Sequence, residues 1–250
     1  MKLTAIFLLM TFNAFSQPLK QLHPDLLPQI DLTQRGRDSI KKASIIYKII
    51  QEKWNNNIKL TTGESNFLDA IGGESDGGAA LDVFLEKGAY YYVGSGYGCC
   101  YYENGGPDSI WSSSSLNANL KADNISEETL DFAWAEGKIG SGVGEWIAFR
   151  MIENAWPMEK IIIYNGYQKD LDLWKKNNRV KQLQLFIDER PIAIFNLKDV
   201  TNGQEFNVKQ WFPKRSENYL IKLKILSVYK GSQYDDTVIS EIVFDGPAMH

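Results

Sequence analysis

Apolar and polar residues alternate in short runs over the second half of the chain, from Trp134 to about Gly246. In the run YLIKLKILSVY, Ile221, Leu223 and Ile225 fall on one face of an extended chain and lysines on the other. Segments containing Gly, Pro, Asn and Asp separate these runs, as turns separate strands. We therefore predict about eight strands, over residues 110–115, 146–151, 159–164, 180–187, 191–197, 205–211, 219–228 and 237–244. This mainly β pattern is typical of a sandwich or jelly roll.

A second pattern predicts an amphipathic helix over residues 33–56. Apolar residues recur there at spacings of three and four: Ile40, Ala43, Tyr47, Ile50 and Trp54. A partner-binding or membrane-surface helix is conceivable, but the basic residues bunch at its N-terminal end, which favours a helix that packs on its own domain. Before this helix, prolines at positions 18, 24 and 28 oppose helix formation. After it, residues 60–103 mix acidic residues with glycine, so residues 17–105 are expected to form a small helix-plus-glycine-rich N-terminal region.

The first sixteen residues have the features of a signal peptide. Lys2 precedes a mostly apolar run from Leu3 to Phe15, and Ala14 and Ser16 occupy the small-residue positions of a cleavage site. We expect cleavage after Ser16, a secreted or periplasmic mature chain, and no integral membrane segment after cleavage. An oxidising compartment permits a disulfide between Cys99 and Cys100, but adjacent cysteines strain such a bridge. Two buried thiols or an intermolecular pair are therefore favoured over it.

Composition excludes several classes of function. The 250 residues carry a net charge of -4, which provides no overall attraction to nucleic acid or to an anionic membrane. The only histidines are His23 and His250, so there is little material for a zinc site or a Ser/His/Asp triad. The glycines of residues 94–98 and 140–144 are spaced G-x-G-x-G without a following helix, which opposes a nucleotide-binding loop.

A series of short phrases carries a family resemblance over residues 108–246. In order they are W-x-E-G, a glycine-rich loop, G-x-G-E-W, I-x-N-G-Y-Q, N-N-R-V-K and V-Y-x-G-x-x-Y-D-D-T-x-I-S-E-I. This order resembles the NADase-type glycan-binding domain, a discoidin-like relative of coagulation factor five/eight type C and galactose-binding modules. The resemblance implies that residues 106–246 form a jelly-roll β-sandwich that binds a glycan and does not catalyse a reaction.

In modules of this kind the loops at one end of the sandwich bind the ligand, and three loops here carry suitable side chains. The candidates are Glu136 and Glu145 in the first loop, Asn165, Tyr167, Trp174, Asn178 and Arg179 in the second, and Tyr234, Asp235 and Asp236 in the third. Structural roles are the alternative for several of them, since Asn165 precedes a turn glycine and Arg179 can pair with the aspartates. Trp174 has charged neighbours, which makes it the best candidate for an exposed platform; a tryptophan that folds back on the sandwich edge is the alternative.

The resemblance also implies a structural calcium ion near the start of the domain. Glu127, Thr129 or Asp131, and Glu241 in the last strand, would supply oxygen ligands. Phe132 departs from the family pattern at the position where threonine is common.

These observations favour an exported, non-catalytic protein that binds a carbohydrate. A module that holds a partner protein at the cell surface is the alternative. An enzyme seated in residues 33–105 is weaker, because the segment has no histidine and no coherent catalytic motif.

Overall fold

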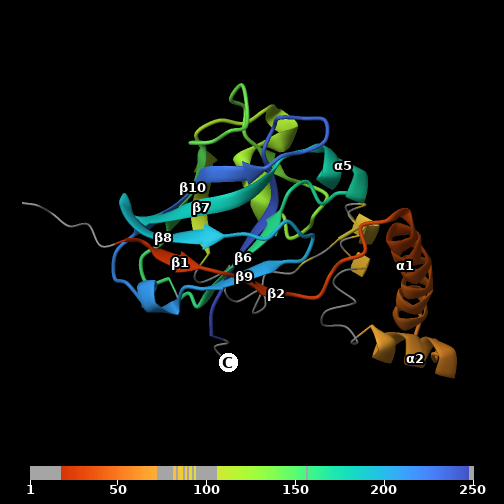
Figure 1. The fold of residues 1–250 in the computed structure, drawn as a ribbon. Helices are drawn as coiled ribbons and strands as arrows, with labels where there is room; N and C mark the ends of the chain where they lie inside the picture. The colour runs from red at the N-terminus through yellow and green to blue at the C-terminus, as the bar shows by residue number, and fades with distance from the viewer. Residues whose placement is uncertain are drawn as a thin grey trace, which may run out of the picture.

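Two β-sheets face each other in the computed structural model of the chain (Figure 1). The structure describes residues 18–71, 81, 82, 84–86, 88, 90, 91, 93, 106–155 and 157–247. The predicted signal peptide, most of the glycine-rich segment, Cys99 and Cys100 lie outside these residues.

The larger sheet contains, in spatial order, β1 (Lys20–Leu22), β8 (Arg190–Asn196), β7 (Arg179–Ile187), β10 (Tyr219–Tyr229), β5 (Trp146–Met151) and β3 (Pro107–Ser112). The smaller sheet contains β2 (Asp25–Leu26), β9 (Gln204–Asn207), β6 (Lys160–Asn165), β11 (Val238–Asp245) and β4 (Trp134–Ala135). The mainly β, two-sheet architecture that the sequence predicts is confirmed. Within the predicted strand 205–211, β9 ends at Asn207, and a short 3-10 helix, η3 (Lys209–Trp211), takes the place of its last residues.

The leader before the helix belongs to both sheets. Strand β1 pairs in parallel with β8, and β2 pairs antiparallel with β9, so residues 20–26 bridge the edges of the two layers. The sequence pattern alone places this segment in the N-terminal region of residues 17–105. The backbone pairing adds it to the sandwich, where an extended, proline-containing chain is suited to an edge strand.

The main core lies between the sheets, and a second core covers the outer face of the smaller sheet. In β6, Ile161 and Ile163 point to the inter-sheet core, while Ile162 and Tyr164 join the outer cluster. That cluster includes Leu32, Tyr91 and Leu130 from outside the sheets. Strand β11 is consequently buried along its whole length, because both faces of the smaller sheet are covered.

Helix α1 (Gln34–Asn55) confirms the predicted helix of residues 33–56. Thr33 caps it by accepting a hydrogen bond from the Gly36 amide, and Tyr47 and Ile50 are buried on one side. It is followed by α2 (Thr62–Ala70), which begins with a Thr61–Glu64 capping box. Both helices lie to one side of the sandwich (Figure 1). Among the described residues, none of the helices is long and apolar enough to cross a membrane.

Candidate functional site

The three loops that the sequence singles out meet at one end of the sandwich. The first and third loops are joined through Thr237, whose amide donates to the Glu136 carboxylate at 3.1 Å and whose hydroxyl donates to the Ser141 carbonyl at 2.9 Å. The Glu136 amide returns a hydrogen bond to the Thr237 carbonyl at 3.2 Å. Residues 136–145, 165–179 and 229–237 are hereafter called the loop end; their loops lie at the top of Figure 1.

The second and third loops are joined through Asn178, which is fully buried. Its side-chain oxygen accepts a hydrogen bond from the Gly231 amide at 2.8 Å, and its amide group donates to the Asp235 carbonyl. Amides of the third loop also donate to carbonyls of Lys175 and Lys176 at 2.9–3.1 Å. The convergence that a binding site at this end requires is therefore present. Asn178 itself is committed to holding two loops together.

A short helix that the sequence reasoning missed lies within the second loop. Asp170 is the N-cap of helix α5 (Leu171–Lys176), and its carboxylate accepts a hydrogen bond from the Leu173 amide at 2.7 Å. Short helices of this length have too few apolar positions for a periodic signal, but an aspartate before an apolar residue is an N-cap signature.

Trp174 lies on α5, and the structure corrects its interpretation as an exposed platform. Its indole N–H donates to the Asn165 carbonyl at 2.9 Å, and the guanidinium carbon of Arg179 lies 4.7 Å from its ring centre. The side chain is only partly exposed. Its charged neighbours point outward from a helix while the tryptophan turns back onto the sandwich edge, so a run of charges around an aromatic residue did not indicate exposure.

Arg179 is buried beneath this tryptophan. It forms a two-pronged ion pair with Asp199, with both N···O distances at 2.9 Å, and donates to the Asn177 carbonyl at 2.9 Å. Asp235 and Asp236, the aspartates suggested as alternative partners, do not form this ion pair. Asp235 pairs with Lys230 instead. A guanidinium so engaged fixes the shape of the loop end.

Asn165 and Tyr167 also face inward. Asn165 exchanges two hydrogen bonds with the backbone of Val180, at 2.7 and 2.9 Å, and so ties β6 to β7. Tyr167 packs against the small apolar cluster of Ala133, Ala135 and Val238, and burial raises the pKa of its hydroxyl. Both residues support the loops from below.

The two glutamates of the first loop differ in their electrostatics. Burial raises the pKa of Glu136, and the nearby charges of Asp236 and Glu145 act in the same direction. Burial acts to raise the pKa of Glu145 as well, but hydrogen bonds from the Ser114 and Ser113 hydroxyls outweigh it and lower the pKa. Glu145 is therefore an anion at neutral pH, at the last residue of the first loop.

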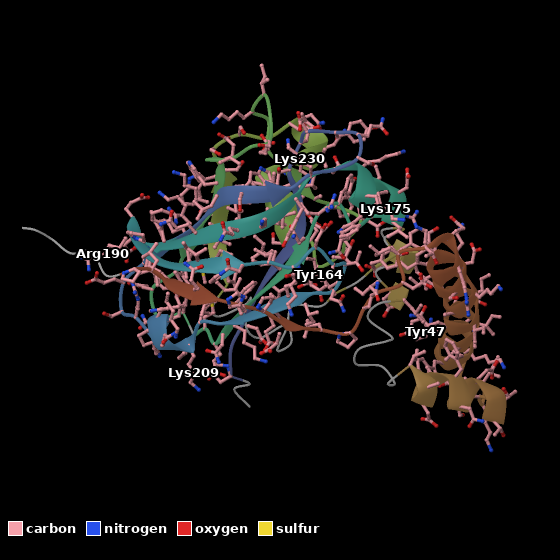
Figure 2. All side chains as sticks on the ribbon, viewed as in Figure 1. Tyr47, Tyr164, Lys175, Arg190, Lys209 and Lys230 are labelled. Carbon is pink, nitrogen blue, oxygen red and sulfur yellow. The ribbon has the colours of Figure 1, made fainter. Side chains whose placement is uncertain are left out.

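The third loop presents the candidates that remain accessible. Tyr234 is 41% exposed, and Lys230 forms an ion pair with Asp235 at the surface. The Lys230 ammonium lowers the pKa of the Asp235 carboxyl. Figure 2 shows Lys230 at the same end of the molecule as α5 and its Lys175. The loop therefore presents an aromatic ring, a cation and an anion, which are the groups that can contact a sugar ring and its hydroxyls.

Sequence reasoning overlooked two apolar side chains of the first loop. Ile139 is fully exposed, and Val143 is 46% exposed. Both side chains stand next to glycines with positive φ, among them Gly140 (103°) and Gly144 (97°). A backbone with these φ values is neither strand nor helix, so neither element buries the two side chains. The detectable signal is an isolated apolar residue between glycines in KIGSGVG.

Among the candidate calcium ligands, Asp131 already has partners within the protein, whereas the Glu127 carboxylate lies near enough to Glu241 to raise the pKa of its carboxyl. Asp131 accepts hydrogen bonds from the Tyr90 and Tyr91 amides at 2.6 and 3.3 Å, so its carboxylate is committed to holding residues 90 and 91. Within the part of the chain that the structure describes, three His, Cys, Asp or Glu side chains are nowhere grouped to hold a metal ion. A structural calcium ion held by Glu127, Asp131 and Glu241 stays a prediction from the family resemblance.

Glu241 is unusual because it is a carboxylic acid buried inside the protein. It is buried on β11 of the smaller sheet, and its Oε2 atom has no hydrogen-bond partner among the described residues. Burial raises its pKa well above the usual value, and the carboxylates of Glu128 and Glu127 add to the effect.

Comparison with known proteins places the sandwich in a family. The model of the NAD glycohydrolase translocation F5/8 type C domain matches residues 101–245, which is more than half of the chain. No curated protein matches the chain in sequence.

Solved structures that resemble the chain do so distantly. One contains the CBM32-1 and CBM32-2 domains of Clostridium perfringens ZmpB in complex with GalNAc, with 12% identity and a TM-score of 0.40 over 57% of this chain and 33% of that one. Another is chitosan-binding module 2 of a chitosanase/glucanase from Paenibacillus sp. IK-5 in complex with chitotriose, with 10% identity and a TM-score of 0.35 over 55% of this chain and 95% of that one. The chain thus spans about a third of the length of the ZmpB structure.

Proposed function

Because the chain belongs to the NAD glycohydrolase translocation F5/8 type C domain family, we propose that it is an exported, non-catalytic protein whose loop end binds a carbohydrate. The observation that carries the proposal is the convergence of three loops through Thr237 and Asn178. Loops fixed to a rigid sandwich provide a preorganised surface, which lowers the entropic cost of holding a ligand.

The ligand contacts are assigned to the exposed groups of the third loop. Tyr234 offers a ring face to the apolar side of a sugar, and the ion-paired Lys230 and Asp235 of the same loop offer a donor and an acceptor. The buried candidates, including Asn178 and Arg179, act as positioning residues, because their polar atoms are already used within the protein.

The proposal that the protein is non-catalytic rests on the hydrogen bonds that the carboxylates of Glu136 and Glu145 already form. A glycosidase needs a pair of carboxyl groups that face the scissile bond. Both oxygens of Glu136 accept backbone amides, those of Thr237 and Lys138, and Glu145 receives two serine hydroxyls. These carboxylates hold the loop in place.

Export is proposed from the first sixteen residues. Expression of the full chain with its leader should yield a mature protein that begins at Gln17. Sequencing the N-terminus of the exported protein tests this; a mature protein that retains Met1 would contradict it.

A glycan array with the full chain and two variants tests carbohydrate binding. Tyr234→Ala should lower binding about tenfold, since an aromatic face on a sugar ring contributes on this scale. Trp111→Ala is the matched control, because Trp111 is 37% exposed on β3 and lies outside the loop end. A folded protein that binds no glycan, or binding that survives Tyr234→Ala unchanged, would refute the assignment.

A second function is supported by a separate observation, the exposure of Ile139 and Val143. Apolar side chains at a loop tip suit a partner protein better than a sugar. If the loop end holds a protein, Ile139→Ser should abolish capture of that partner, and free sugars should not compete with it. The Tyr234→Ala variant separates the two functions, because it should weaken glycan binding and spare the partner.

A further inference from the structure

Helix α1 carries apolar residues on two sides, and only one of these sides packs against the described part of the chain. Tyr47 and Ile50 are buried, and the side chains of Tyr47 and Gln51 reach Asp82. On the opposite side, Ile45 is 62% exposed, Ile49 is 44% exposed and Ile46 is 40% exposed. In Figure 2, Tyr47 lies on the side of α1 nearer to the sandwich, and other side chains project from the outer side of the helix.

Basic residues surround these three isoleucines. Ile45 and Ile49 are spaced four apart, and the exposed Lys42 and Lys48 lie three residues from Ile45 on either side. Lys41 lies apart from them, because its ammonium is 5.9 Å from the ring centre of Tyr90. We call these five side chains the outer face of α1: Lys42, Ile45, Ile46, Lys48 and Ile49. Apolar positions at the centre with lysines at the margins are typical of a helix that lies in a membrane interface.

The charge of the helix differs in sign from that of the chain. Helix α1 has an excess of four positive charges, whereas the whole chain has a net charge of -4. This excess is the difference between six basic and two acidic side chains: Arg35, Arg37, Lys41, Lys42, Lys48 and Lys53 against Asp38 and Glu52. Arg37 and Lys53 are paired with Asp170 and Glu64, and two of the other four basic residues, Lys42 and Lys48, lie on the outer face.

From this arrangement we propose that α1 docks the protein on an anionic phospholipid surface. The isoleucines would enter the interface between headgroups and acyl chains, and the lysines would contact lipid phosphates and carboxylates. A second copy of the chain fits this face poorly, because a two-fold interface would bring the same lysines together. The proposal goes beyond carbohydrate binding and does not depend on it.

The N-terminal end of α1 is attached to the sandwich, so docking would also orient the sandwich. Arg37 donates to the Lys169 carbonyl, and its guanidinium carbon lies 5.2 Å from the ring centre of Tyr90. Lys169 precedes α5, which belongs to the loop end. A membrane contact through α1 would therefore hold the loop end at a set distance from the bilayer.

Co-sedimentation of the full chain with lipid vesicles tests the proposal. One set of vesicles contains phosphatidylcholine alone, and the other contains phosphatidylcholine mixed with an equal amount of phosphatidylserine. The chain should sediment with the second set and not with the first, and added salt should weaken this binding through screening.

Paired substitutions identify the face. Ile45→Asn with Ile49→Asn should lower partitioning at least about tenfold, because two exposed apolar side chains no longer enter the interface. Lys42→Glu with Lys48→Glu should lower it by a similar factor. Leu26→Asn is the matched control, because Leu26 is 42% exposed on β2. Circular dichroism should show unchanged helix content in each variant.

Three results would overturn the proposal. The first is equal binding to both sets of vesicles, which would exclude recognition of anionic lipid. The second is binding that survives both pairs of substitutions, which would place the lipid contact elsewhere. The third is failure to bind vesicles together with concentration-dependent self-association that Ile45→Asn with Ile49→Asn removes, which would assign the outer face to contact between copies of the chain.

Discussion

Replacing Arg179 with methionine tests whether this residue supports the loop end or contacts the ligand. Methionine keeps much of the aliphatic stem and removes the guanidinium. The change would leave the Asp199 carboxylate without its ion-pair partner and the Asn177 carbonyl without its donor. It would also remove the cation from the ring of Trp174. The fold of the two sheets should survive, because the substituted atoms lie at one end of the sandwich.

The expected loss of stability follows from these contacts. A hydrogen bond to a charged group contributes about 1.5–3 kcal/mol, and an exposed ion pair contributes about 1 kcal/mol or less. The side chain of Asp199 is 37% exposed, so its ion pair with Arg179 should contribute about 1 kcal/mol, as an exposed pair does. The bond to the Asn177 carbonyl and the stacking on Trp174 add to it. We expect Arg179→Met to lower the free energy of unfolding by about 3 kcal/mol, or the Tm by about 6–12 °C.

Urea and thermal unfolding followed by tryptophan fluorescence measure this loss. Asp199→Asn should cost only about 1 kcal/mol, because it leaves the carbonyl bond and the stacking intact. Arg179→Lys should fall between the two, since lysine keeps the charge but cannot form the two-pronged pair. If Arg179→Met costs less than about 1 kcal/mol while glycan binding disappears, the structural reasoning is wrong and Arg179 is a ligand contact.

Two further predictions concern the same fold. Gly166 has a φ of 87°, and a Cβ there would lie 2.6 Å from the Arg179 side chain and 2.7 Å from Trp174. Gly166→Ala should therefore lower the free energy of unfolding by about 2–3 kcal/mol. An unchanged urea midpoint would contradict this. Burial raises the pKa of Glu241 above the 4.5 of an unperturbed glutamate, so the folded state binds its proton more tightly than the unfolded state and stability falls as pH rises above that value. Glu241→Gln should remove this fall, and equal urea midpoints for variant and wild type at every pH, measured with a chelator present, would refute it.

Local patterns predicted the elements of the fold well. Alternation along β10 is confirmed, with Tyr219, Ile221, Leu223 and Ile225 buried. The helix of residues 33–56 begins and ends within a residue of the prediction, because Thr33 is a strong N-cap. These features depend on neighbours in sequence, which is why sequence alone suffices for them.

Side-chain roles at the loop end were harder to predict. The sequence identified the loops that converge, but it did not separate Tyr234, which is exposed, from Asn178 and Arg179, which are buried. The same polar residue types occur in loops whether their side chains face a ligand or form hydrogen bonds with the backbone. Which of the two they do depends on partners far away in sequence, such as Gly231 for Asn178 and Asp199 for Arg179.

The sequence by itself determined where the strands and the main helix lie, since periodicity and capping act over a few residues. Only the tertiary structure decided that residues 20–26 complete the sheet edges and that Trp174 turns inward. It also decided that the isoleucines of the outer face of α1 are exposed. The reason is physical: strand pairing and burial depend on which distant segments cover a residue, and a pattern within one segment carries no information about that cover.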